Sequence, residues 1–330
     1  PLLPFQGYKQ ESPDVTENTP YFLPEDRKHV ILSVNPKAGR RNSQSRVQRL
    51  EAALQKEGLT VETMTDLQQV AEKANLWFEE RKLRALIGIG GDGTAAELTN
   101  RTVPGVPIAL LPSGTANLLA KHFRYSFQPE KFARMILQGK VLTIDAARAN
   151  GRIFLAMIGS GFDADVVEQV HQARMAHPKH AHINYFSYTK PILHSILHYP
   201  FPRVQLEILD AEGKVLETLH DSHWLFISNI PKYGWGVPIT PKAVPNDGVM
   251  DVCLWRGGSL ASGLFLTVTA QCGIHPWFSR CHMRTGNRFR ISLAPGQKEV
   301  PVPYQLDGDP GGNLPVEVEV LPRRLTIYVR

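Results

Sequence analysis

Short apolar runs alternate with longer, half-polar stretches over the first third of the chain. In the stretches, apolar residues recur every three or four positions, as Val47, Leu50 and Leu54 do, which is the spacing of one helix face. Strands that alternate with such helices predict a parallel sheet with helices on both faces and a ligand site at its carboxyl edge. The predicted strands lie at residues 29–34, 60–64, 85–89 and 107–111.

The pattern becomes rich in strands after about residue 141. The last two runs, at 316–320 and 325–329, alternate apolar and polar residues and predict a hairpin joined by a short turn. Many short strands of this kind predict an antiparallel second domain, built as a sandwich. The predicted strands are 141–148, 152–158, 203–209, 214–219, 223–229, 249–255, 288–293, 316–320 and 325–329.

These patterns predict an α/β fold with an N-terminal Rossmann-like parallel domain and a C-terminal antiparallel β-sandwich. Residues 1–26 carry five prolines and are expected to form an extended arm. We place the nucleotide-binding α/β domain at 27–143 and the β-rich domain at 144–321. A C-terminal strand at about 322–330 is a candidate to return to the first domain.

Composition narrows the function only slightly. With 37 Lys and Arg against 31 Asp and Glu, the net charge of +6 suits anionic lipid, phosphorylated substrates or nucleic acid, and equally suits plain solubility. The basic residues are scattered, without a recognition helix or an aromatic stripe, which argues against a nucleic-acid partner.

Cysteine usage and apolar content bear on the compartment. The chain has three cysteines, Cys253, Cys272 and Cys281, without C-x-x-C spacing. A disulfide framework is therefore not expected, and the expected compartment is a reducing cytoplasm. The first residues lack the features of a secretory signal. Residues 260–278 are interpreted as a core helix, with lipid contact as the alternative, so any membrane contact is expected to be peripheral.

A glycine-rich loop, Gly90-Gly91-Asp92-Gly93-Thr94, follows a predicted buried strand and precedes a predicted helix. Glycines let backbone N–H groups approach phosphate oxygens, and a helix N-terminus favours an anion. The carboxylate of Asp92 would repel phosphate unless a cation lies between them, which indicates Mg²⁺ at the nucleotide. The alternative is a simple turn in which Asp92 caps a helix.

No lysine follows these glycines, so the loop is neither a Walker loop nor a dinucleotide fingerprint. It resembles the GGDGT signature of the diacylglycerol kinase catalytic domain family, which includes sphingosine kinase-like proteins and is distantly related to NAD kinases. Further motifs resemble that family in the same order, over about residues 28 to 330. They are Asn35-Pro36-Lys37-Ala38-Gly39, Leu111-Pro112-Ser113-Gly114-Thr115-Ala116-Asn117, Gly161-Phe162-Asp163-Ala164, Tyr233-Gly234-Trp235-Gly236 with Asp247-Gly248, and Asp307-Gly308-Asp309.

The resemblance implies an ATP-dependent phosphotransferase with an alcohol acceptor. It would pass the γ-phosphate of ATP to a hydroxyl of diacylglycerol or a related lipid, with ATP between the two domains and 144–321 as the lipid-substrate domain. The expected location is cytoplasmic, at the inner membrane surface, with a homodimer left open. The nucleotide-binding residues implied are Asn35, Pro36, Gly39, Arg40, Thr65, Gly90, Gly91, Asp92, Gly93, Thr94, Ser113, Gly114, Thr115 and Asn117.

The resemblance also assigns the catalytic and metal residues. Asp307 is implied as the general base, with Asp92 and Asp309 as the other catalytic carboxylates, although Asp309 replaces the family's glutamate. An Asp-Gly pair is also a strong hairpin signal, so a plain turn is the alternative for Asp307. A structural Mg²⁺ is implied at the Asp247 carboxylate with the carbonyls of Val244 and Val249, besides the Mg²⁺ near Asp92.

Two other functions stay open on the sequence. One is a kinase with a soluble acceptor, as in NAD kinases, which share the GGDGT loop. The other is a non-catalytic nucleotide- or lipid-binding regulator, because Asp309 and Trp235 depart from the family pattern.

Overall fold

The N-terminal half is a parallel sheet between two layers of helices, as the alternating pattern predicts. The computed structural model describes residues 19–34, 41–114, 116–176, 195 and 199–330. The strands lie in the order β3-β2-β4-β5 and all three pairings between them are parallel. Their bounds are β2 (His29–Val34), β3 (Thr60–Met64), β4 (Leu83–Gly90) and β5 (Pro107–Pro112).

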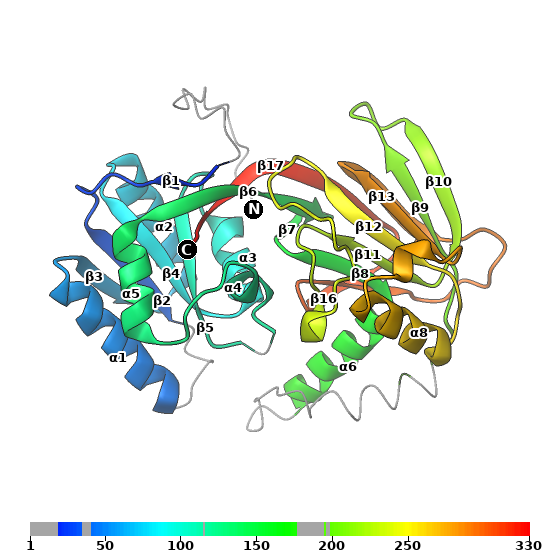
Figure 1. Ribbon diagram of the computed structural model, residues 1–330, viewed down its shortest axis with the longest axis horizontal. Helices are drawn as coiled ribbons and strands as arrows, with labels where there is room; N and C mark the ends of the chain where they lie inside the picture. The colour runs from blue at the N-terminus through cyan, green and yellow to red at the C-terminus, as the bar shows by residue number, and fades with distance from the viewer. Residues whose placement is uncertain (1–18, 35–40, 115, 177–194, 196–198) are drawn as a thin grey trace.

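Helices cover both faces of this sheet (Figure 1). Helices α1 and α5 pack together, while α2 packs against α3. Strands β4 and β5 are buried along their whole length, which explains their unbroken apolar sequence. The helices are α1 (Arg41–Lys56), α2 (Leu67–Glu79), α3 (Asp92–Arg101), α4 (Leu118–His122) and α5 (Pro129–Gln138).

The C-terminal half is the predicted antiparallel sandwich. One sheet has six strands in the order β13-β12-β11-β8-β15-β16, and all its pairings are antiparallel. It packs its apolar face against β9, β14 and part of β17, which belong to the larger sheet. The strands are β6 (Lys140–Ala149), β7 (Arg152–Phe154), β8 (Met157–Gly161), β9 (Val204–Leu209), β10 (Val215–Ser222), β11 (Trp224–Ser228), β12 (Met250–Trp255), β13 (Cys281–Gly286), β14 (Arg288–Leu293), β15 (Pro303–Leu306), β16 (Asp309–Asn313) and β17 (Val316–Tyr328).

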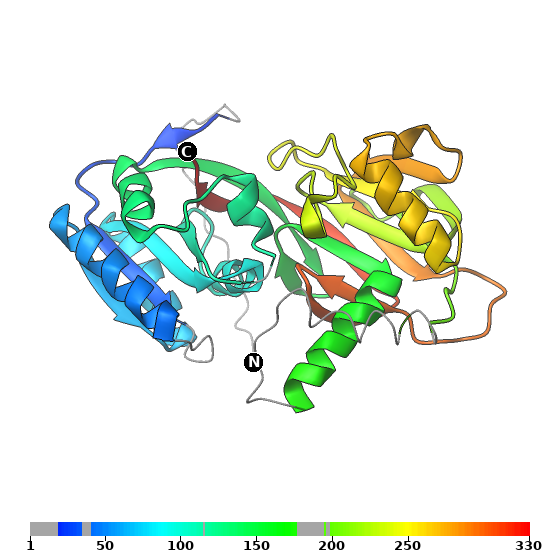
Figure 2. The ribbon, with the colours of Figure 1, turned by 60° about the horizontal axis from the view of Figure 1, so that its bottom comes forward.

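The outer face of the six-stranded sheet is covered by helices (Figure 2). Residues of α6 (Phe162–Ala176) and α8 (Leu260–Gln271) share one buried cluster with β11 and β12. A short 3₁₀ turn, η4 (His275–Trp277), follows α8 and leads into β13. At the other end of the chain, β1 (Tyr21–Phe22) pairs with β6.

The predicted hairpin at 316–320 and 325–329 is wrong, because these residues form one continuous strand, β17. Its first half alternates buried and exposed side chains, while residues 325–328 are all buried. The residues between them form an irregularity in the pairing with β6, where Arg323 adopts a φ of +55°. A local bulge therefore takes up the residues that resembled a turn.

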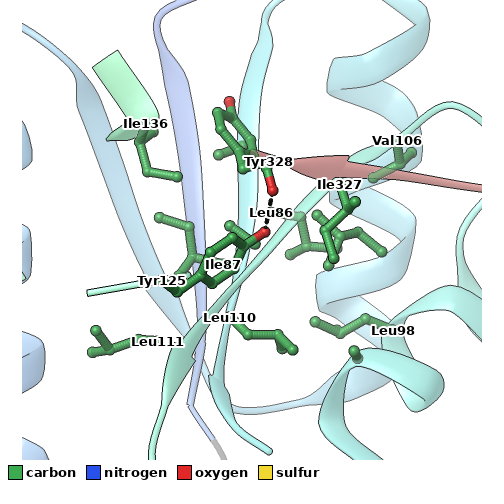
Figure 3. Close-up of a cluster of buried hydrophobic side chains, with 14 of the residues drawn as sticks. Leu86, Ile87, Leu98, Val106, Leu110, Leu111, Tyr125, Ile136, Ile327 and Tyr328 are labelled. Atoms are coloured by element: carbon green, nitrogen blue, oxygen red, sulfur yellow. Dashed lines mark hydrogen bonds between the residues drawn. The ribbon is translucent and has the colours of Figure 1, made fainter. Parts of the chain in front are cut away.

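Strand β17 joins the two halves of the molecule. Its first half pairs with β14, and its second half runs parallel to β5, where Ile327 lies beside Ile108. Ile327 and Tyr328 belong to the apolar core of the first domain, and the Tyr125 hydroxyl donates to the Tyr328 carbonyl at 2.7 Å (Figure 3).

The buried carboxylate of Asp145, on β6, stabilises the bulge in β17. Its Oδ1 accepts the N–H of Arg323 and its Oδ2 accepts the N–H of Gly248, each at 2.7 Å. Burial raises the pKa of this carboxyl against the lowering effect of the two N–H groups. Asp145 thus ties β6, β17 and the loop before β12 together.

We predict that Asp145→Ala lowers the free energy of unfolding by about 2–4 kcal/mol, because two N–H groups lose their acceptor in a buried place. Urea unfolding followed by circular dichroism measures this change. Glu319→Ala, which removes an exposed pairing partner of Arg148, is the matched control and should change stability by less than about 1 kcal/mol. An equal loss of unfolding free energy in both variants would contradict the proposed stabilisation of the bulge by Asp145.

Candidate active site

The GGDGT loop connects a buried strand to a helix, as predicted. Strand β4 ends at Gly90, and α3 begins at Asp92 with Gly91 as its N-cap. The N-cap residue is a glycine and offers no side chain of its own to cap this helix start. A helix N-terminus at the carboxyl edge of a parallel sheet is a favourable place for an anion.

The two glycine-containing segments predicted to hold nucleotide lie against each other. A Cβ on Gly114 would be only 2.8 Å from the Cα of Gly91, which leaves no room for a side chain. The N–H of Ser113 donates to the Gly90 carbonyl at 3.0 Å, and Ser113 is exposed. Glycine is therefore required here because two backbones touch, whether or not a phosphate also approaches them.

Asp92 is buried, and its carboxylate bonds to the start of the next helix. Its two oxygens accept the N–H groups of Leu118 at 2.8 Å and Leu119 at 2.9 Å, at the start of α4. Burial raises the pKa of this carboxyl, although both N–H bonds lower it. Because N–H groups already meet this charge, a cation is not needed to explain it, and Mg²⁺ beside Asp92 stays a prediction.

Asn117 shapes the second glycine-containing loop. Its Oδ1 accepts the Gly114 N–H at 3.0 Å and its Nδ2 donates to the Gly114 carbonyl at 2.6 Å. Arg46, on α1, donates to the carbonyl of Pro112 at 3.1 Å, at the entry to the same loop. Nothing in the sequence around Arg46 singled it out, since its acceptor is a backbone atom far along the chain.

Asp307 forms a hairpin turn and also buries its carboxylate. Asp307 and Gly308 join β15 to β16 with φ values of +52° and +87°, which is typical of a two-residue type I′ turn. The alternative of a hairpin turn is therefore present, and the catalytic role of Asp307 stays a prediction. The carboxylate accepts N–H groups at 2.8–2.9 Å from the three consecutive residues Leu155, Ala156 and Met157.

The environment of Asp307 raises the pKa of its carboxyl to about 7. Burial is the main cause, the three N–H bonds oppose it, and the charge of Asp92 adds to it. The two aspartates, one from each domain, are therefore close enough to interact. A carboxyl that titrates near neutral pH suits general acid–base chemistry.

Asp309 reaches the GGDGT loop itself. It is the first residue of β16, and its Oδ2 lies 2.5 Å from the position that a Cβ on Gly93 would occupy. Its carboxylate is also 3.9 Å from the guanidinium of Arg152, and both side chains are about half exposed. The Asp307-Gly308-Asp309 turn of one domain thus contacts the GGDGT loop of the other.

A buried network behind the turn was not among the predicted site residues. The Tyr233 hydroxyl donates to Oδ1 of Asp163, and the Gln305 side-chain amide donates to Oδ2 at 3.3 Å. Burial raises the pKa of Asp163 to about 6. Gln305 also accepts the Gly308 N–H at 2.7 Å. The GFDA and YGWG motifs were the available signal, since they contain Asp163 and Tyr233.

The loop predicted to hold a structural metal ion is rich in negative charge. Asp247 is exposed and accepts the Val249 N–H at 3.2 Å. Burial and then the charge of Asp247 raise the pKa of Asp251 to about 6, and Asp247 also raises the pKa of Asp145. A cation would relieve this repulsion, which suits the donor set predicted with the carbonyls of Val244 and Val249. The metal assignment itself stays a prediction.

The other predicted nucleotide-binding residues lie at the end of β3, in the first turn of α3, or outside the described residues. Thr65 is exposed directly after β3, at the carboxyl edge of the parallel sheet. Gly93 and Thr94 lie in the first turn of α3. The predicted contacts at Asn35, Pro36, Gly39, Arg40 and Thr115 fall outside the described residues.

Several named proteins are similar to most of this chain. The chain is 24% identical over 287 residues to an Escherichia coli protein named probable lipid kinase YegS, covering 82% of this chain and 87% of that protein. It is 25% identical over 250 residues to the diacylglycerol kinase of Mycobacterium tuberculosis, covering 74% and 76%. The solved structure of a diacylglycerol kinase from Bacillus anthracis has the same fold, with a TM-score of 0.62 at 20% identity over 92% of this chain and 97% of that one.

Two family profiles match consecutive parts of the chain. Residues 29–149 match the diacylglycerol kinase catalytic domain, and residues 156–329 match the YegS C-terminal NAD kinase beta sandwich-like domain. The order and extent of these matches agree with the motifs that suggested the resemblance. The chain belongs to the diacylglycerol kinase catalytic domain family of lipid kinases, with a YegS-type β-sandwich as its second half.

Proposed function

We propose that this protein transfers the γ-phosphate of ATP to a hydroxyl of diacylglycerol or a related lipid. The contact between the two domains carries the proposal. Asp307 and Asp309 of the β-sandwich meet Asp92 and Gly93 of the glycine-rich loop, and the pKa of the Asp307 carboxyl is about 7. Phosphoryl transfer to an alcohol uses a carboxylate that can accept the proton of the hydroxyl next to the loop that binds phosphate. A carboxyl with a pKa near neutral beside the GGDGT loop suits this role.

The nucleotide side of the reaction would use backbone groups more than side chains. Gly91 and Gly114 let the two loops present their backbones together, and the start of α3, whose N-cap Gly91 has no side chain, offers N–H groups to phosphate oxygens. Asp92 and Asn117 would act as positioning residues, because their side chains hold the loops. When bound, Mg²⁺ would neutralise phosphate charge, and the half-exposed carboxylate of Asp309 is the better placed ligand for it.

The acceptor side would use Asp307 as the general base. Its carboxylate takes the proton of the lipid hydroxyl as the hydroxyl oxygen forms a bond to the γ-phosphorus. The bond from that phosphorus to the bridging oxygen breaks, and ADP leaves with the electron pair. The three N–H groups on Asp307 fix its position throughout, so the base needs no reorganisation.

Transfer of labelled phosphate from ATP tests the proposal directly. Purified protein with Mg²⁺ and vesicles that contain diacylglycerol should yield a labelled lipid, while NAD offered in parallel should stay unlabelled. Label on NAD alone would favour a soluble-acceptor kinase. Binding of ATP without transfer to any lipid would favour a non-catalytic regulator, and either result would overturn the proposal.

Asp307→Asn should lower the rate of lipid phosphorylation by about 100- to 10,000-fold, the range that general bases contribute. The affinity for ATP, measured by calorimetry, should change little. The variant loses one N–H acceptor, so its thermal midpoint is measured as well. Asp221→Asn, the same change at an exposed carboxylate that pairs with Arg203, is the matched control and should keep full activity.

The pH profile gives Asp307 a second readout. The base must be ionised, so turnover should fall about tenfold per pH unit below about 7. Stability should change in the opposite direction, because burial penalises the ionised form in the folded protein. The contribution of this carboxyl is fully present below the ordinary pKa of 3.8 and is lost as pH rises from there to about 7. Asp307→Asn should lack this loss, and an unchanged pH dependence would contradict the assignment.

We also propose that α8 and η4 bind an anionic lipid surface. Among the described residues, no helix is both long and apolar enough to cross a bilayer. The predicted core helix is only half buried: Leu266 and Ala270 face the sheet, whereas Leu264, Val268 and Trp277 are 63%, 55% and 82% exposed. This exposed set, with the partly exposed Leu260 and Phe265, is here termed the α8 patch.

Basic residues border the α8 patch and favour a lipid occupant over a protein one. Arg256 and Arg280 are both exposed, and the N–H of Arg256 donates to the Arg280 carbonyl at 2.9 Å, so they lie side by side. An exposed tryptophan suits the headgroup region of a membrane, and two arginines attract anionic headgroups.

Replacing Leu264 and Val268 by Asp should weaken binding to anionic vesicles at least about tenfold and raise the KM for vesicle-borne lipid. The kcat for a water-soluble, short-chain diacylglycerol should stay unchanged, because the α8 patch is distinct from the site of transfer. Leu216→Asp, at a position on β10 that is 65% exposed, is the matched control. Vesicle binding by the double variant at wild-type strength would refute the proposed surface.

A further inference from the structure

Two cysteines and a histidine form a buried cluster away from the candidate active site. Cys253 lies on β12, Cys281 begins β13, and His275 begins η4, and all three are buried. One potential ligand atom from each lies within 4.8 Å of the others. Over residues 19–34, 41–114, 116–176, 195 and 199–330, this is the one group of three or more such side chains with that closeness.

The pairing of β12 with β13 brings the two sulfurs together. Cys253 is opposite Met283, and Cys281 is opposite Trp255, so the cysteines are diagonal neighbours on one face of the sheet. Their Sγ atoms are 3.9 Å apart. Two thiolates on a tetrahedral zinc ion, each at about 2.3 Å, are about 3.8 Å apart, whereas a disulfide needs about 2.05 Å.

The histidine supplies a second, independent observation. Its Nε2 is 2.9 Å from the Ile239 carbonyl, an acceptor, so Nε2 carries the proton. Its Nδ1 is therefore unprotonated and carries a lone pair, and this atom is buried without any hydrogen-bond partner. A histidine that binds a metal through one nitrogen while the other donates to a backbone carbonyl has this same arrangement.

We infer that Cys253, His275 and Cys281 form a zinc site. Two thiolates and an imidazole are a common zinc donor set, and zinc is usually four-coordinate. The Sδ of Met283 is 3.7 Å from the Cys281 sulfur, but a thioether favours Cu⁺ over zinc, so a water would be the fourth ligand.

The ion would have a structural role. It would link two neighbouring strands to η4, the turn that follows α8, and through the Nε2 bond it would fix the loop at Ile239 as well. Side chains from these three segments, which are already joined by the backbone pairing of β12 with β13, would then share bonds to one ion. This inference is independent of the proposed kinase activity, because none of its residues takes part in transfer.

Metal binding by the whole chain tests the inference. Protein treated with a chelator and then with one equivalent of Zn²⁺ should retain about one zinc per chain by mass spectrometry, and its thermal midpoint should rise. Co²⁺ in place of zinc should give the intense thiolate-to-cobalt absorption of a tetrahedral site. Cys281→Ser should lose both signals, as should His275→Gln, which keeps a donor for the Ile239 carbonyl.

Cys272→Ser is the matched control, since Cys272 is an exposed thiol outside the cluster, and it should retain zinc fully. If the cluster variants fail to fold, the cobalt spectrum of the unaltered chain decides. Absence of the thiolate-to-cobalt band, retention of Cu⁺ but not Zn²⁺, or a disulfide between Cys253 and Cys281 in the reduced and purified protein would each overturn the zinc assignment.

Discussion

The pairing of β6 with β17 is the interaction on which the rest of the structure depends. Both strands run from one domain into the other, and their backbone hydrogen bonds continue across the boundary. Arg324, on β17, donates to the carbonyls of Thr99 and Thr102 at the C-terminal end of α3, the helix that begins in the GGDGT loop. The relative position of the two domains, and so the contact between Asp309 and Gly93, is fixed by a shared ribbon and not by a flexible linker.

Buried carboxylates hold the segments around that ribbon. Asp92, Asp145 and Asp307 each accept backbone N–H groups from a segment distant in sequence. Each of them also has a raised pKa, since burial outweighs the stabilisation by those N–H groups. Burial of Asp307 thus has two effects: it joins distant segments through backbone N–H bonds, and it brings the pKa of the carboxyl close to neutral.

Sequence patterns predicted the layers well because the layers follow from local periodicity. The buried strands at 85–89 and 107–111 and the sandwich were found this way. The strands at Cys281–Gly286 and Asp309–Asn313 were missed, since Arg284 and the Pro-Gly-Gly at 310–312 give no apolar alternation. The pattern of β17 predicts a hairpin, because a bulge and a turn can be built from the same residues.

The site was predictable as motifs but not as contacts. The partners of Asp92 and Asp307 are backbone N–H groups, which any residue type provides, so their identity leaves no trace in the sequence. The same holds for Cys253 and Cys281, whose separation of 28 positions matches no metal-binding spacing. Only the register between β12 and β13 brings them together, and register is a property of the folded sheet.

The position of β17 has a consequence for how the protein is made. This strand follows every other described strand in the sequence, yet it is inserted between β5 and β14 inside the larger sheet. While a ribosome is still adding the sandwich, β5 therefore exposes an unpaired edge and α3 lacks the guanidinium that caps it. The parallel sheet is synthesised before the sandwich but is completed only by β17, so an emerging chain would depend on protection of the β5 edge until β17 is made.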